Sequence, residues 1–147
     1  MPWISRKEAS CLQVGDIVET DVRIPGTKVT FPIFKHYGII VYVCKIPYIC
    51  HLPGRVKPIF ESLESFENER VIGRVLRDKN TEALNNDKLV DNYHRLVDKE
   101  YRFWGHNCES FVREMTDNKV NIGLDQRCGY GILVLIILLI IYLATRK

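Results

Sequence analysis

The stretch His36-Tyr37-Gly38-Ile39-Ile40-Val41-Tyr42-Val43 is the strongest strand signal in the chain and decides the fold class. Most of its residues are β-branched or aromatic, and such side chains pack well on a pleated surface. Further strands are predicted near Asp16 to Asp21, at Tyr48 to Leu52 and, with a weaker pattern, at Val71 to Leu76. The first half of the chain is therefore expected to form a β-sheet.

The segments between these strands have the composition of loops and turns. Val22 to Lys35 contains two prolines and a glycine, and it is predicted to be a loop or an irregular hairpin. A turn is expected at Lys45 to Pro47, and Asn80 to Asn86 is a polar loop.

Helical spacing follows this polar loop. Asp87 is a candidate N-cap, and the apolar residues after it recur on one helix face: Leu89, Val90, Tyr93, Leu96 and Val97. Tyr101 to Trp104 is a short apolar segment. Asn107 is predicted to cap a second helix, whose buried face carries Cys108, Phe111, Val112 and Met115. Strands followed by helices indicate an α+β domain in which an antiparallel sheet packs on helices.

Composition restricts the kind of protein. The 147 residues include 27% charged and 46% hydrophobic residues, which is an ordinary globular balance. The net charge of +3 shows no concentrated basic patch, so a nucleic-acid-binding module is not expected. The five cysteines have no Cys-x-x-Cys spacing, which argues against a zinc site, and their odd number argues against a disulfide framework. No apolar signal segment is present near Met1, so the body is expected in the cytosol.

The run from Tyr130 to Ala144 is uncharged and has basic residues on both sides. Its length of about 22 Å as a helix falls short of a hydrocarbon core of roughly 30 Å, which leaves a buried core helix as an alternative. The run is nevertheless apolar all round, which favours a single-pass C-terminal membrane anchor. Residues 1–127 are accordingly predicted to be one domain and residues 128–147 the anchor.

Cys108 is the candidate nucleophile among the five cysteines. A thiol in the first turn of a helix faces the positive end of the helix dipole, which lowers its pKa toward the thiolate. A thiolate nucleophile also needs an imidazole within hydrogen-bond reach, and a third group that holds this imidazole in one tautomer. His36 and His51 lie on adjacent predicted strands, so a hairpin would set them side by side. His94 falls on the polar face of a helix, and His106 is expected to point away from Cys108.

Five short motifs occur in order along the chain: Gly15-Asp16, His36-Tyr37-Gly38-Ile39, Cys50-His51-Leu52, Asn85-Asn86 and Asn107-Cys108-Glu109-Ser110-Phe111-Val112. In this order they resemble the lecithin retinol acyltransferase-like family, which includes small phospholipase and acyltransferase proteins. The resemblance spans Leu12 to Met115. It implies a circularly permuted papain-like fold of the NlpC type.

The resemblance also implies roles for three residues. Cys108 matches the nucleophile, His36 the general base and His51 the polar residue that orients this base. The implied reaction takes an acyl chain from a glycerophospholipid onto Cys108 and passes it to an amine, a lysophospholipid, an alcohol or water. No cofactor or metal is expected. The anchor would hold the catalytic domain on the cytosolic side of a membrane that supplies the substrate.

Two departures from the family pattern limit what it implies. Ser110 stands where the family usually has histidine, and fourteen residues separate His36 from His51, a few more than expected. Two alternatives use the same fold. One is an NlpC-type cysteine peptidase or amidase, and the other is a catalytically silent membrane adaptor.

Overall fold

The computed structural model describes residues 3–24, 26–54, 57–78, 84–100, 107–120, 122 and 124–146. Its centre is one six-stranded sheet in which every neighbouring pair of strands is antiparallel. In chain order the strands are β1 (Trp3–Ser5), β2 (Ile17–Arg23), β3 (Thr30–Val43), β4 (Ile46–His51), β5 (Ile59–Ser62) and β6 (Ile72–Leu76). Their spatial order is β1-β6-β2-β3-β4-β5, so β2 and β3 lie in the middle of the sheet.

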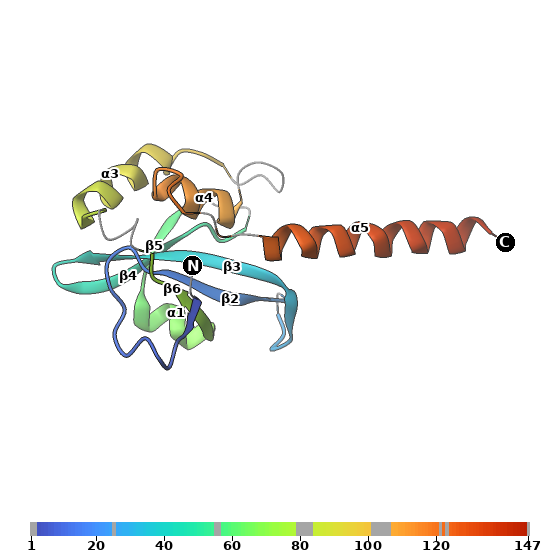
Figure 1. Ribbon diagram of the computed structural model, residues 1–147, viewed down its shortest axis with the longest axis horizontal. Coiled ribbons are helices and arrows are strands. Elements are labelled where there is room, and N and C mark those ends of the chain that lie inside the picture. The colour runs from blue at the N-terminus through green and yellow to red at the C-terminus, as the bar shows by residue number, and fades with distance from the viewer. Residues whose placement is uncertain are drawn as a thin grey trace.

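Helices cover both faces of this sheet (Figure 1). One face carries α3 (Asn86–Leu96) and α4 (Cys108–Met115), and the other carries α1 (Leu63–Glu69). The fourth helix of the described residues, α5 (Leu124–Thr145), starts in contact with β3 and projects away from the body. The predicted α+β class, with an antiparallel sheet packed on helices, is confirmed.

The alternation of side chains along β3 divides the core into two parts. Tyr37, Ile39 and Val41 pack under α3 and α4 together with Phe111 and Val112. Ile40, the residue between two of them, packs on the other face among a second set of buried side chains that includes Phe66 of α1. Successive residues of β3 therefore point into different cores, as the two-residue period of a strand requires.

Of the two alternatives predicted for Val22 to Lys35, the irregular hairpin is confirmed and the loop is wrong, because β2 runs to Arg23, β3 begins at Thr30 and the two strands pair there. The register explains the irregularity that the sequence suggested. Asp21 is opposite Lys35, but Val22 is opposite Phe31, so the residues between Phe31 and Lys35 form a bulge. Pro32 lies in this bulge, where a proline costs no ladder hydrogen bond.

Three elements were not predicted: β1, β5 and α1. β1 and β5 form the two edges of the sheet and are only 3 and 4 residues long. In α1 the only buried residue is Phe66, so the helix has almost no apolar periodicity to detect. The predicted cap of α3 is also corrected. Asn85, rather than Asp87, is the N-cap, and its side chain accepts a hydrogen bond from the amide of Lys88 at 2.9 Å.

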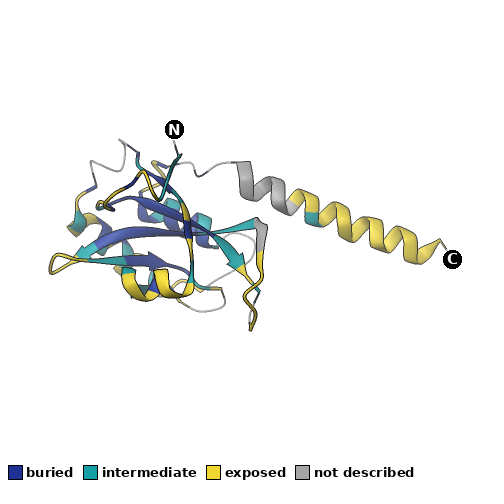
Figure 2. Ribbon diagram, turned by 90° about the horizontal axis from the view of Figure 1, so that it is seen from below, coloured by how far each residue is buried: buried dark blue, intermediate teal, exposed yellow. Residues whose placement is uncertain are grey.

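Helix α5 carries an apolar surface that nothing in the described chain covers along its outer part (Figure 2). Apart from the half-buried Leu133, its large hydrophobic side chains between Ile132 and Leu143 are 45 to 67% exposed. The expected transmembrane helix falls within α5. Among the described residues, however, no helix reaches the combined length and hydropathy that a membrane crossing requires. The short apolar segment Tyr101 to Trp104 lies outside the described residues.

Candidate functional site

His36 on β3 and His51 on β4 form the centre of the site. Their rings meet edge to face, and His36 Nε2 lies 2.9 Å from His51 Nδ1. Gly38 makes this approach possible, because it lies directly opposite His51 in the register of the two strands. A Cβ atom at Gly38 would come within 2.5 Å of the Ile49 side chain and 3.3 Å of His51 Cβ. The predicted pairing of the two histidines is therefore found in the structure.

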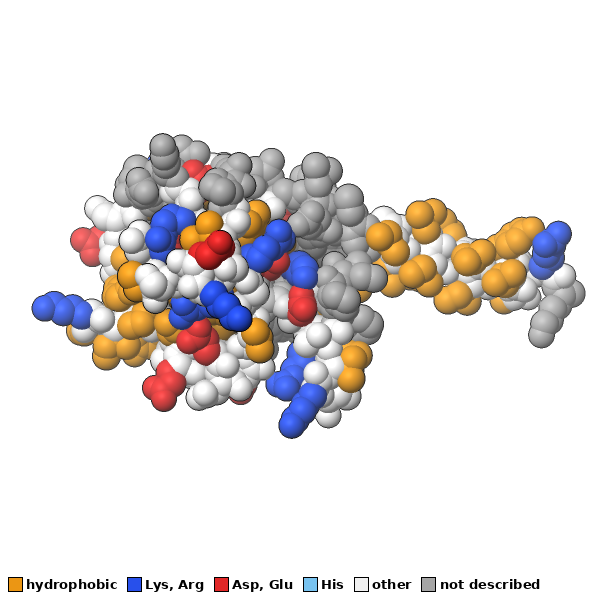
Figure 3. Space-filling view, turned by 60° about the horizontal axis from the view of Figure 1, so that its bottom comes forward, with side chains coloured by type: hydrophobic (Ala, Val, Ile, Leu, Met, Phe, Trp, Pro, Cys, Tyr) orange, Lys and Arg blue, Asp and Glu red, His pale blue; other side chains and the backbone are white. Residues whose placement is uncertain are grey.

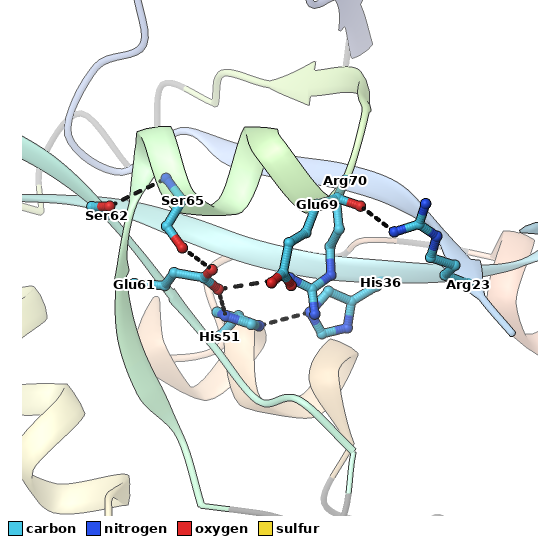
Figure 4. Close-up of polar contacts among 8 residues, drawn as sticks. All are labelled: Arg23, His36, His51, Glu61, Ser62, Ser65, Glu69 and Arg70. Carbon is cyan, nitrogen blue, oxygen red and sulfur yellow. Dashed lines mark hydrogen bonds and ion pairs between the residues drawn. The ribbon is translucent and has the colours of Figure 1, made fainter. Parts of the chain in front are cut away.

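A carboxylate that was not predicted completes a chain of three side chains. Glu61 on β5 is paired with Ile49 of β4 and is therefore diagonal to His51, and its Oε2 is 3.0 Å from His51 Nε2. Ser65 Oγ donates a hydrogen bond to the other carboxylate oxygen at 2.8 Å. Arg70 Nη1 lies 3.6 Å from Glu61 Oε2 (Figure 4). Each oxygen of the Glu61 carboxylate therefore has a hydrogen-bond donor, His51 at Oε2 and Ser65 at Oε1, and the Arg70 cation lies near Oε2.

The order of these hydrogen bonds assigns the protons on both imidazoles. An ionised carboxylate only accepts, so His51 Nε2 must carry a proton and donate it to Glu61. A neutral His51 then has a lone pair on Nδ1, which accepts from the Nε2–H of His36. His36 Nδ1 is left with a lone pair. The nitrogen with the free lone pair is the one that a general base needs.

Burial keeps both rings neutral. It lowers the pKa of His51 to about 3, with a smaller contribution in the same direction from the cation of Arg70. Burial also lowers the pKa of His36 well below its ordinary value, helped by His51 and Arg70. The Phe66 ring forms part of the apolar surroundings of both imidazoles. Its centroid lies 6.5 Å from that of the His36 ring, in a stacked arrangement, and 5.2 Å from that of the His51 ring, which it meets edge to face.

This burial predicts a pH-dependent stability. The unfolded chain binds protons at histidine near pH 6.5, whereas the folded chain resists them until far lower pH, so stability falls as the pH drops below about 6.5. We expect a loss of about 1.4 kcal/mol per pH unit for each such histidine. The free energy of unfolding is measured with urea at several pH values between 7 and 5. This range lies above that in which most carboxylates titrate, so the histidines dominate the slope. His51→Gln should reduce the slope, and His94→Gln, at an exposed position, should not. Equal slopes for wild type and His51→Gln would contradict the assignment.

Cys108 is the first residue of α4, as predicted. It is 7% exposed and packs in the core under α3 and α4. Its thiol donates a weak hydrogen bond to the carbonyl oxygen of Lys35, with Sγ and O 3.7 Å apart. The thiol therefore contacts β3 at the residue immediately before His36.

The thiol and the imidazole pair approach β3 from its two faces. The neighbours of Cys108 belong to the core that contains Tyr37, whereas His36 and His51 lie over Phe66 of α1. Residues 36 and 37 are adjacent and point in opposite directions. The structure thus brings the two predicted histidines into direct contact and brings the predicted nucleophile to the neighbouring backbone.

Ser110 has a structural role in α4. The Asn107 side chain accepts from the Ser110 amide at 3.0 Å, and Ser110 Oγ accepts from the Asn107 amide at 2.8 Å. This is a capping box, which satisfies two amides that the first turn of a helix leaves without partners. The predicted N-cap at Asn107 is confirmed, and the serine helps to hold the turn that carries Cys108.

Two other motifs are structural. Asp16 accepts two hydrogen bonds from the guanidinium of Arg77, at 2.9 and 2.7 Å. The Asn86 side chain makes two hydrogen bonds with the backbone of Tyr42: its Oδ1 accepts from the Tyr42 amide, and its Nδ2 donates to the Tyr42 carbonyl oxygen. Tyr42 lies on β3 beyond the point where pairing with β2 begins, so β2 does not supply these partners. His94 is exposed, as expected, and His106 lies outside the described residues.

The sequence contained a weak signal for Glu61. It lies between Phe60 and Ser62 in a short apolar segment, and an acid there suggests a buried partner. Arg70 had no such signal, because it is one of several charged residues after α1. Within the described residues, no group of three or more metal-binding side chains is found.

Comparisons of the chain with protein-family models, with curated proteins and with solved structures find no match.

Proposed function

We propose that this chain is a membrane-associated thiol acyltransferase or phospholipase A of the lecithin retinol acyltransferase-like kind, with a permuted papain-like fold. The observation that carries the proposal is the hydrogen-bonded series of side chains Glu61, His51 and His36, which leaves a lone pair on His36 Nδ1. Cys108 contacts Lys35, the residue immediately before His36. A carboxylate, an imidazole relay and a thiol at a helix N-terminus are the parts that acyl transfer through a thioester needs.

In the first half-reaction the Cys108 thiol first turns toward His36, and its proton then passes to His36 Nδ1 as Sγ attacks the ester carbonyl carbon of a glycerophospholipid. The carbonyl π-electrons move onto oxygen, and backbone amides in the first turn of α4 stabilise this oxyanion. When the carbonyl reforms, the bond to the glycerol oxygen breaks, and this oxygen takes the proton from His36. The products are a lysophospholipid and an acyl-thioester on Cys108.

In the second half-reaction an amine, an alcohol, a lysophospholipid or water loses a proton to His36 as it attacks the thioester. The bond to Sγ breaks, and the leaving thiolate recovers the proton. His51 holds the His36 ring throughout, and Glu61 holds His51. Because burial keeps His36 neutral, proton transfer accompanies the attack, and no stable thiolate–imidazolium pair is needed beforehand.

The exposed apolar side chains of α5 support a membrane location. A surface of this kind on a helix that projects from the body needs a cover, and lipid is a cover that also supplies the substrate. We place the catalytic domain on the cytosolic side.

A direct test is detection of the thioester. Full-length protein is incubated with phosphatidylcholine labelled in its acyl chains, quenched in acid and digested. We expect a hydroxylamine-sensitive acyl group on the peptide that contains Cys108. The Cys108→Ala protein is the control and should carry none. Label on Cys11 or Cys44, both exposed, in place of Cys108 would contradict the proposal.

A silent adaptor with the same fold is the second candidate, and one observation favours it. Cys108 and the imidazole pair pack into different cores, so the thiol must turn toward His36 before a proton can pass. An adaptor would keep its fold and its membrane binding but would form no thioester with any phospholipid. The incubation above therefore separates the two candidates.

A further inference from the structure

A pocket of about 290 Å³ opens beside His36, on the side of the sheet that α1 covers. It lies where β2 ends, where the chain leaves β4 and where α1 ends. Its lining residues are Asp21, Val22, Arg23, His36, Pro53, Gly54 and Arg70. The imidazole relay therefore has an opening that two arginines line, Arg23 and Arg70.

A second, larger hollow of about 460 Å³ continues from this pocket and shares Asp21, Arg23 and Arg70 with it. It adds three cations to the lining: Lys28, Lys35 and Arg74. Together the two hollows have five cationic and three carboxylate side chains. Figure 3 shows Lys and Arg side chains gathered on a protrusion of the body beside the start of α5. This charged region therefore lies at the same end of the molecule as the apolar helix.

The three carboxylates are largely occupied by neighbouring cations. Glu19 receives two hydrogen bonds from Arg74, at 2.9 and 2.8 Å, and Asp21 is paired with Lys35. Glu69 lies 3.8 Å from Arg70 Nη1. The excess positive charge of the two hollows therefore falls on Arg23 and Lys28, with Arg70 close by.

The two arginines are also held in place. Arg23 Nη1 donates to the backbone oxygen of Glu69 at 3.1 Å, which holds its guanidinium at the end of α1, while the Arg70 side chain extends toward His36 and Glu61 (Figure 4). The Arg70 guanidinium stacks over the Phe66 ring at 5.0 Å. Arg70 Nη1 is buried, and within the described residues it has ion-pair neighbours beyond 3.5 Å but no hydrogen-bond acceptor. A buried donor of this kind gains most from an acceptor supplied by a ligand.

We infer that this pocket binds the phosphate group of a lipid, and that Arg23 and Arg70 select phosphate-bearing esters over neutral ones. Two arginines that line one opening can supply guanidinium donors to the oxygens of a phosphate. A phosphate there would bring the ester of the same molecule to the His36 side of β3. The choice of an ester substrate rests on the proposed function, whereas the recognition of phosphate does not.

The test measures binding without turnover. The full chain with Cys108→Ala, kept in a maltoside detergent, is titrated with dihexanoylphosphatidylcholine and with dihexanoylglycerol, which has the same acyl chains and no phosphate. Arg23→Gln and Arg70→Gln should each raise the Kd for the phospholipid about tenfold, which equals about 1.4 kcal/mol, and should leave the Kd for dihexanoylglycerol unchanged. The matched control is Arg95→Gln, an exposed arginine on α3, which should change neither value.

A ring resonance distinguishes occupation of the pocket from binding elsewhere. Phospholipid should shift the His36 imidazole signals and leave those of His94 in place, and this shift should be lost in Arg23→Gln. Equal affinity for the two lipids, or an unchanged Kd in both arginine variants, would overturn the inference. Inorganic phosphate that bound more tightly than the phospholipid would overturn the lipid as its source. Because the protein lacks Cys108, all these results are independent of whether a thioester forms.

Discussion

His36→Ala is expected to lower kcat/KM for acyl release from a short-chain phospholipid by about 10²- to 10⁴-fold, the usual contribution of a positioned general base. The reason is the order of protons along the chain of side chains. Glu61 makes His51 a donor at Nε2, so His36 must donate from Nε2 and accept at Nδ1. Alanine removes the accepting nitrogen altogether, and water in its place is neither held nor oriented.

Variants of His51 and Glu61 should lose less activity than His36→Ala. His51→Gln keeps an oxygen that accepts from His36 Nε2–H, so it should retain more turnover than His51→Ala. Glu61→Gln lets the amide donate to His51, which reverses both tautomers and puts a proton on His36 Nδ1. We expect it to lower activity about tenfold or more, as loss of an orienting partner commonly does.

The order of activities is therefore wild type, His51→Gln, His51→Ala and, at the bottom, His36→Ala. Glu64→Gln is the matched control for the carboxylate, because Glu64 is exposed on α1, and it should behave as wild type. Urea unfolding at pH 7.5 shows which variants are folded when they are assayed. Full activity in His36→Ala, together with loss of activity in His94→Ala or His106→Ala, would contradict the assignment.

Removing α5 should abolish the membrane binding that is proposed for the full chain. The outer part of this helix exposes large apolar side chains that lose contact with water only when lipid covers them. A chain that ends at Arg127 should therefore leave the membrane fraction completely. In the full chain, Ile136→Lys with Leu139→Lys should do nearly the same, because a lysine at the centre of a bilayer costs about 2.5 to 3.5 kcal/mol.

The control for apolar surface in general is Ile46→Lys. Ile46 is 52% exposed at the start of β4 and lines neither of the two hollows, so a lysine there should leave membrane binding unchanged. The measurement is sedimentation with phosphatidylcholine vesicles, followed by extraction in alkaline carbonate. Carbonate extraction of the full chain would contradict an anchor and would make α5 a peripheral or protein-binding helix.

The parts of the fold that could be predicted from the sequence are those with a strong period. The strand at His36 to Val43 and the helix after Asn107 each bury one face completely enough to leave a pattern. β5 and α1 do not, because an edge strand of 4 residues and a helix with one buried residue have no period to detect. The pairing of His36 with His51 was predictable because both residues lie on strands that the sequence pattern predicts as neighbours.

The rest of the candidate site could not be predicted, because it depends on contacts between unpredicted elements. Glu61 belongs to β5, and Arg70 follows α1, so neither could be placed beside His51 before these elements were known. The side of β3 from which Cys108 arrives is also a tertiary property. Alternation along the strand shows that His36 and Tyr37 point apart, but it does not show which face α4 covers.

The turn between β3 and β4 provides a way to observe how the domain sits on a membrane. Cys44 and Lys45 form its tip, both with positive φ, at 51° and 66°, and Cys44 is exposed. This tip lies at the end of the body opposite to α5 (Figure 1). A fluorophore or spin label on Cys44, in a chain with Cys11→Ser, Cys108→Ala and Cys128→Ser, would therefore report the height of the far end above the lipid surface. A label held far from the lipid would mean that the domain stands upright on α5, and a label at the surface would mean that it lies flat.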